Sequence, residues 1–252
     1  MISALLKKEW MEFTRNYKLL IMSCIFLFFG FSSPLMAKFM PDILTNFLPK
    51  EVAESFPAPT AFDSWAQYFK NISQMGLFVN VLVFGSILSN ERQSGTLIIF
   101  LTKGLKRPHV IYVKSIFSMA MWTIFYILAF VITYVYTAIY FDTSVISQLF
   151  LSVFLLWLFG IFILSVTILG NVLFQSYFST LLFTAAIVVV LFIISIFPKL
   201  EKISIIRLAN ENNAILHGQF QLSDYSYPIA LTILCCLIFH LIAVRLFNRK
   251  EI

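Results

Sequence analysis

Residues able to carry out chemistry are few in this sequence and lie far apart. The three histidines, His109, His217 and His240, fall in three separate regions. A metalloprotease would need His and carboxylate ligands at helical spacing, as in H-E-x-x-H, and no such motif is present. A serine nucleophile would need a histidine beside it, and no motif supports a pairing of His240 with Ser165 or Ser195. The sequence therefore argues against an enzyme.

The cysteines and glycines indicate no cofactor or metal site in this chain. Cys24, Cys235 and Cys236 all lie in apolar stretches, where cysteine behaves as a small hydrophobe. Neighbouring residues on a helix point about 100° apart, which suits neither a disulfide nor a zinc site. The chain contains no G-x-x-x-x-G-K-[ST] loop. Any nucleotide chemistry would have to come from another polypeptide.

The most informative polar segment is Ser89–His109. Its run Thr96–Lys103 predicts one or two helical turns, ended by Gly104. Leu97 and Leu101 give these turns an apolar face between charged flanks. A short apolar helix displayed at a protein surface needs something to bind.

The composition places this segment in a membrane protein. Hydrophobic residues make up 60% of the 252, aromatic residues 17% and charged residues only 12%, with 29 Phe. Soluble domains carry about a quarter charged residues. This composition excludes a disordered tail, a collagen-like repeat and a disulfide scaffold, and it argues strongly against a soluble globule.

Six apolar runs are long enough to cross a bilayer, which takes about 20 residues in a helix. They are Leu19–Ala37, Ile72–Ser89, Ser115–Phe141, Gln148–Leu169, Phe178–Phe197 and Pro228–Leu246. Gly170–Asn171 and Gln175–Tyr177 supply the polar break between the fourth and fifth runs. The runs do not alternate with period two, which argues against a barrel. We expect an all-α integral membrane protein with six transmembrane helices.

The basic residues predict that both termini are cytoplasmic. With the N-terminus inside, twelve Lys and Arg residues fall on the cytoplasmic side and six on the outer side. Acidic residues show the opposite bias. The net charge of +6 therefore reflects topology and requires no nucleic acid. The 18 residues before the first run include Glu9 and Glu12, which argues against a cleaved signal peptide.

We treat 1–252 as a single transmembrane domain with four parts outside the spans. Residues 1–18 predict an amphipathic interfacial helix, because apolar side chains recur at spacings of three and four. These are Ile2, Leu5, Leu6, Trp10, Phe13 and Tyr17. Residues 38–71 form an outer loop whose prolines exclude one long helix, so short helices between Pro turns are expected.

The other two parts are a cytoplasmic loop at 90–114 and an outer segment at 199–227. In the outer segment Leu200, Ile203 and Ile206 share a helical face, which predicts a short helix at the outer interface.

The 90–114 loop and the order of the elements resemble type-2 ABC transporter permeases, the membrane subunits of ATP-driven exporters. Members of that family commonly show an acidic residue, then Gly-Thr and a Leu-rich short helix, then a basic stretch entering the next span. The matching residues here are Glu91, Gly95, Thr96, Leu97 to Leu101, Lys103, Arg107 and Lys114. The resemblance extends over the whole chain, from the amphipathic helix to the outer segment before the last span.

The resemblance implies a dimer of permeases in the cell membrane, each docked on a separate ATP-binding subunit that carries ATP and Mg. ATPase activity is then expected only in complex with that partner. The residues implied in coupling are Glu91, Arg92, Gly95, Thr96, Leu97, Leu101, Lys103 and Arg107. ATP binding would push the short helix, and the spans would re-pack to open a path outward.

In this family the second and fifth spans usually line the dimer interface and the translocation path. The candidate lining residues are Phe78, Asn80, Phe84, Phe183, Thr184 and Phe192. With 29 Phe in the chain, each aromatic taken alone is more typical of lipid contact or bundle packing. A charge-free, aromatic interior suits hydrophobic or amphipathic cargo such as membrane-active peptides, lipids or drugs.

Two other classes of membrane protein stay open, a secondary transporter and a channel with no ATPase partner. A secondary transporter or proton pump usually places ionisable residues inside its spans, and among the six runs only His240 fits besides Tyr and Cys. No paired, broken helices are seen in matching halves. A channel filter would need rings of carbonyls or charges. A channel also has no need of a displayed apolar helix.

Overall fold

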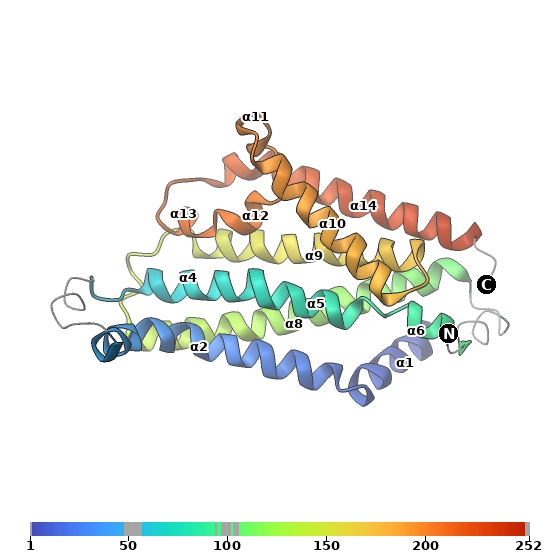
Figure 1. Cartoon of the computed structure of the whole chain (residues 1–252), viewed down its shortest axis with the longest axis horizontal. Coiled ribbons are helices and arrows are strands. Elements are labelled where there is room, and N and C mark those ends of the chain that lie inside the picture. Colours follow the sequence, from blue (N-terminus) through green and yellow to red (C-terminus); the bar gives the residue numbers. More distant parts are fainter. Residues whose placement is uncertain (1, 48–56, 94, 97–101, 103–105, 250–252) are drawn as a thin grey trace.

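The chain folds as a helical bundle, seen in a computed structural model that describes residues 2–47, 57–93, 95–96, 102 and 106–249. Every regular element in these residues is helical. Six helices are long and apolar enough to cross a membrane, and most of them lie along the long axis of the molecule (Figure 1). The prediction of an all-α protein with six membrane-spanning helices is confirmed.

The helices that form the spans are α2 (Lys18–Phe47), α4 (Ala61–Asn71) continued by the π-helix η1 (Ile72–Gly76) and α5 (Leu77–Phe84), α8 (Arg107–Tyr140), α9 (Leu149–Leu173), α10 (Tyr177–Ser195) and α14 (Ser226–Arg249). The shorter elements are α1 (Ile2–Arg15), α6 (Ser89–Gln93), α11 (Pro198–Glu201), α12 (Arg207–Asn210), α13 (Asn212–Leu216) and the 3₁₀ helix η2 (Leu222–Tyr225).

Helix α1 begins and helix α14 ends at the same end of the bundle (Figure 1). An even number of spans requires this arrangement. We call this the basic end, because α6, the start of α8 and the end of α14 bring Arg92, Arg107 and Arg249 to it. The charge distribution predicts that the basic end is cytoplasmic.

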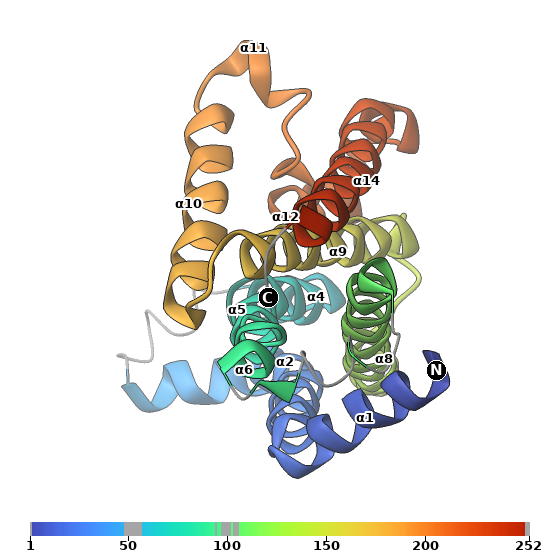
Figure 2. The same ribbon diagram turned by 90° about the vertical axis from the view of Figure 1, so that its right-hand side faces the viewer.

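The second and fourth spans form the centre of the bundle. Within their most apolar windows 61% of the residues are buried, against 11% in α10 and 17% in the last span. Figure 2 shows α9 and α5 in the middle, with α10 and α14 extending outward. A methyl group added at Gly160 of α9 would lie 2.2 Å from the Trp122 ring of α8. The missing side chain thus lets these two spans meet closely.

The second span begins earlier than the sequence predicted. It starts at Ala61 rather than Ile72, because Thr60 and Asp63 form a capping box. The Thr60 N–H donates to Asp63 Oδ2 at 2.7 Å, and the Thr60 hydroxyl donates to the same oxygen at 2.9 Å. The expected outer loop of 38–71 is correspondingly shorter.

The first span also extends beyond the expected end. Helix α2 runs to Phe47 and contains Pro34 and Pro41, where short helices between Pro turns were expected. A proline removes one backbone hydrogen bond, and long spanning helices tolerate that loss when neighbouring groups compensate. Helix α2 thus continues through Pro41, and no proline turn begins at that residue.

The break between the fourth and fifth spans lies later than predicted. Asn171 is inside α9 and fully buried, and the chain leaves the helix at Phe174. The Asn171 amide donates to the carbonyl of Phe84 at 3.3 Å, and its oxygen accepts the Leu88 N–H at 3.4 Å. These bonds satisfy backbone groups where α5 ends, before α6 begins. Asn171 therefore joins the two central spans rather than separating two helices.

The outer segment does not form the one short helix expected. It comprises α11, α12, α13 and η2, and the three residues assigned to one face are divided. Leu200 and Ile203 are exposed while Ile206 is buried. Helix α13 packs toward α4, where the rings of Phe62 and His217 stack with centroids 4.2 Å apart.

Candidate functional site: a charge cluster and an apolar cleft

Helix α1 attaches to the bundle through a face that contains a carboxylate. Leu5, Glu9 and Phe13 are its buried residues and recur every four positions. Ile2 and Trp10 of the predicted apolar face are instead exposed, 46% and 47%. Phe13 packs on Phe84, Phe117 and Phe125. Because Glu9 lies on the same face of α1 as Phe13, it also faces the bundle interior.

A charge cluster forms where α1, α6 and α8 meet, and it consists of Lys8, Glu9, Glu12, Glu91 and Lys114. Lys114 Nζ donates to Glu9 Oε1 at 2.7 Å and lies 2.9 Å from Glu91 Oε1. Lys8 pairs with Glu12 at 2.8 Å and also contacts Glu91. Three segments far apart in the sequence are thereby joined by charge.

Burial makes the cluster interdependent. The Lys114 side chain is fully buried, and Glu9 and Glu91 are each 3% exposed. A buried ion is tolerated only when partners replace its hydration. Removing Lys114 would leave Lys8 alone to balance the two buried carboxylates.

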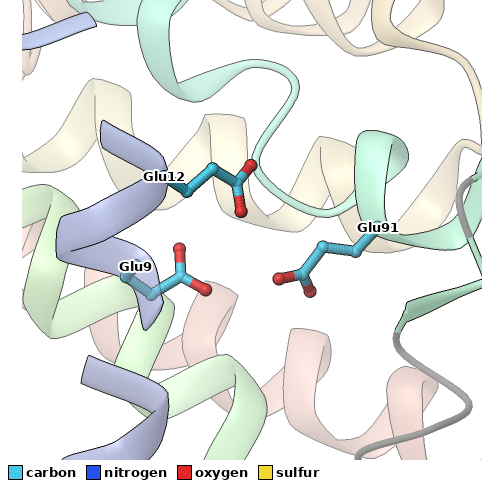
Figure 3. Close-up of side chains that lie close together, drawn as sticks. All are labelled: Glu9, Glu12 and Glu91. Carbon is cyan, nitrogen blue, oxygen red and sulfur yellow. The ribbon is translucent and has the colours of Figure 1, made fainter. Parts of the chain in front are cut away.

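The carboxylates of Glu9, Glu12 and Glu91 point toward a common space (Figure 3). Three carboxylates in such an arrangement can hold a cation. Here the ammonium groups of Lys8 and Lys114 supply the positive charge. The cluster is thus best described as a network of ion pairs.

Glu12 lies at the edge of the cluster, and its side chain is 23% exposed. Burial acts to raise the pKa of Glu12, but the hydrogen bond and positive charge of Lys8 outweigh it and hold this pKa below its ordinary value. The group is therefore ionised at neutral pH and pairs with Lys8 at the edge of the cluster.

Arg92 anchors α6 to the fourth span. Its Nη1 donates to the carbonyls of Asn171 at 3.3 Å and Phe174 at 3.2 Å. These are carbonyls at the C-terminal end of α9, which attract cations. The guanidinium also lies over the Phe247 ring of α14 at 5.7 Å.

Arg107 anchors the other end of the loop. It lies in the first turn of α8, and its Nη1 donates to the Asn248 carbonyl of α14 at 3.2 Å. Both flanks of the 90–114 loop are thus bonded to spans: Glu91 to α8, Arg92 to α9 and Arg107 to α14.

The remaining residues expected to couple this chain to an ATPase are partly described. Gly95 has φ of +69°, a conformation that glycine adopts without strain. The Thr96 hydroxyl donates to the Glu91 carbonyl at 3.5 Å. Leu97, Leu101 and Lys103 lie outside the described residues.

An apolar cleft of about 530 Å³ lies between the second and fifth spans. The fourth span and α12 complete its walls. Its lining residues are mostly aliphatic or aromatic: Ser73, Gln74, Leu77, Phe78, Val81, Leu82, Phe159, Ile163, Leu181, Leu182, Thr184, Ala185, Val188, Val189, Phe192, Ile206, Ala209 and Asn210. The volume is in the range of pockets that hold one small ligand, about 300–1,000 Å³.

Three of the six residues predicted to line a path do line this cleft. They are Phe78, Thr184 and Phe192. The two phenylalanines are 58% and 50% exposed, so their rings are available to a bound molecule. The cleft thus lies between the two spans that the family resemblance predicts to line the path.

The other three predicted lining residues, Asn80, Phe84 and Phe183, are not in the cleft wall. Asn80 and Phe84 are buried, and Phe84 stacks on Phe13 of α1 with centroids 6.0 Å apart. Phe183 packs on Phe174 at 5.7 Å. Asn80 is two positions from Phe78, and residues two apart on a helix point to nearly opposite sides, so the two cannot line the same wall.

The sequence reasoning missed Glu9 and Asn171 as structural residues. Glu9 lies midway between Leu5 and Phe13 at four-residue spacing, so an acid on the apolar face was readable from the sequence. Asn171 carried an amide at the end of an apolar run, which a turn explains equally well. Its bonds to the second span required the structure.

The fold and its relative define a multi-pass protein embedded in a membrane. The chain is 25% identical over 256 residues to the "Uncharacterized transmembrane protein YxlG" of Bacillus subtilis (strain 168). The match covers 98% of this chain and 97% of that protein. No family model matches the chain.

Proposed function

We propose that this chain is the transmembrane permease subunit of an ABC-type exporter in the cell membrane. It would work as a permease dimer and move hydrophobic or amphipathic cargo outward. ATP and Mg would be bound and hydrolysed on a separate ATP-binding subunit docked at the basic end. The chain itself would supply no catalytic group and would bind no nucleic acid.

The observation that carries the proposal is the anchoring of the 90–114 loop. Its two flanks are bonded through Glu91, Arg92 and Arg107 to α1, α8, α9 and α14. A partner that pushes the loop would therefore move four helices at once.

The burial of Glu91 changes the part that this residue would play. Its carboxylate faces the interior of the bundle and is 3% exposed, so it would hold the loop in place rather than contact the partner. In this proposal the contact itself would be made by other residues of the loop, among them Gly95 and Thr96. In this proposal Glu91 is a positioning residue.

The cleft between α5 and α10 supports the cargo class. Its wall is mainly hydrocarbon, and apolar molecules partition into such a space. Its position between the second and fifth spans is where the family resemblance expects the translocation path.

The first test is isolation of the tagged chain from its native membrane in a mild detergent. A stoichiometric partner with a G-x-x-x-x-G-K-[ST] loop, and ATPase activity that depends on this chain, are the expected results. A chain that comes out with no ATPase would overturn the proposal in favour of a channel or a secondary transporter.

The second test is Glu91→Gln in the reconstituted complex. We expect cargo transport to fall while ATP hydrolysis continues, because the loop would lose its ion pairs with Lys8 and Lys114. Glu12→Gln is the matched control, since it makes the same chemical change at the exposed edge of the cluster. Unchanged transport in Glu91→Gln would show that the loop does not couple the two activities.

A further inference from the structure

Three of the four hydrogen-bonding side chains that line the cleft lie toward one end of it, and the fourth, Thr184, is buried and donates to the Thr180 carbonyl at 3.0 Å. Ser73 and Gln74 belong to η1, and Asn210 belongs to α12. Because the second and fifth spans run in opposite directions, these residues lie near Phe192, whereas Leu82 and Leu181 form the far end. The polar end is the one away from the basic end (Figure 1).

Two amides at the polar end have no hydrogen-bond partner among the residues that the structure describes. The side chains of Gln74 and Asn210 are exposed and make no hydrogen bond within the described part of the chain. The Ser73 hydroxyl, in contrast, donates to the Lys70 carbonyl of its own helix at 3.2 Å. Because both side chains are exposed, their donors and acceptors are available to a molecule that enters the cleft and can hydrogen-bond.

The charge of the cleft limits what can bind. None of the described residues that line it is ionisable, so nothing there would compensate a charged head group. A buried ion without a partner is strongly disfavoured. An amide offers both a donor and an acceptor, which matches hydroxyl groups.

We propose that the cleft binds a neutral lipid from the surrounding bilayer, with one apolar chain and a hydroxyl-bearing head such as glycerol. The head would lie at Gln74 and Asn210. The chain would run past Phe78 and Phe192 toward Leu82. That this lipid type represents the exported cargo rests on the proposed function, whereas the binding itself does not.

The probe for the test is a monoacylglycerol with a diazirine in its acyl chain, added to the purified full chain in nanodiscs. We expect photolabelled peptides to map to 77–82 and 181–189. Unlabelled monoacylglycerol should compete at least about tenfold better than the same chain carrying a carboxylate or a trimethylammonium head, as an unpaired charge would dictate.

The double variant Gln74→Leu/Asn210→Leu tests the head site. It should lose the preference for monoacylglycerol over a plain alkyl chain, a change of about tenfold if the two amides each supply a hydrogen bond. Asn213→Leu is the matched control, because Asn213 is an exposed amide of α13 that does not line the cleft. Folding of each variant is checked by unfolding temperature.

Equal competition by all head groups, or an unchanged preference in the double variant, would overturn the proposal. Cross-linking of two copies through the cleft wall that excludes the probe would also overturn it, because a second copy would then be the occupant. If no ATPase partner is found and the probe still binds as described, only the export function fails.

Discussion

Each end of the molecule contains a network of ion pairs, and the two networks differ in how far apart in the sequence their residues lie. At the basic end Lys114 joins Glu9, 105 positions away in the sequence, and Glu91. At the opposite end Arg207 pairs with Glu211 four positions away, at 2.8 Å. The second network holds one short stretch in shape, whereas the first ties separate helices into one unit.

The local network is nonetheless well built. The Arg207 guanidinium contacts both oxygens of Glu211, and the Tyr225 hydroxyl donates to Glu211 Oε2 at 2.6 Å. The hydrogen bond to Glu211 raises the pKa of Arg207, against the opposing effect of its burial. Its partners are all within the segment between α10 and α14, so its loss should be felt there. The Arg207 network therefore has several bonds but does not connect one span to another.

The largest effect is expected from Lys114→Met. Breaking a buried ion pair by removing one partner costs about 3–5 kcal/mol, and here two buried carboxylates, Glu9 and Glu91, lose their buried partner and keep Lys8 between them. The free energy of unfolding in detergent measures the loss, and amide exchange in α1 should rise with it. Lys7→Met, on the exposed side of α1, should change stability by less than about 0.5 kcal/mol. If Lys114→Met and Lys7→Met lowered the free energy of unfolding equally, the charge cluster would not stabilise the fold as described.

Arg207→Met should have an intermediate effect that stays local. Hydrogen bonds to charged groups contribute about 1.5–3 kcal/mol, and the Arg207 side chain is 9% exposed. Amide exchange should rise in α12 and α13 but not in α1. An equal rise in α1 would erase the distinction between the two networks.

Glu12→Gln should have the smallest effect. An i,i+4 pair such as Lys8–Glu12 contributes about 0.3–0.5 kcal/mol. Since the pKa of Glu12 is lower in the folded state, its contribution is present above the unfolded pKa, about 4.3. It is lost as the pH falls through the folded pKa. Unfolding measured from pH 6 to 3 should therefore show a weaker acid dependence in the variant, and an identical dependence would count against this ion pair.

The span count was predictable because length and hydropathy are properties of each segment alone. The residues at which the spans begin and end were harder to predict. The capping box at Thr60 and Asp63 was readable in the sequence, but the passage of α2 through Pro41 depends on its helical neighbours.

The candidate site was predictable only in part, because hydropathy and helical period describe each segment alone. The sequence named Glu91 and the second and fifth spans as candidates, and helical period alone would have separated Phe78 from Asn80. The burial of Lys114 beside Glu9 depends on how α1 lies against α8, and one sequence does not specify that placement.

The burial of Lys114 also has a consequence for assembly. A lysine entering a bilayer without a partner is costly, and proteins generally fold from the N-terminus during synthesis. Glu9 and Glu91 both precede Lys114 in the chain, so both carboxylates have been made before the lysine emerges. Because of this order, the carboxylates that pair with Lys114 are already present when the third span is inserted.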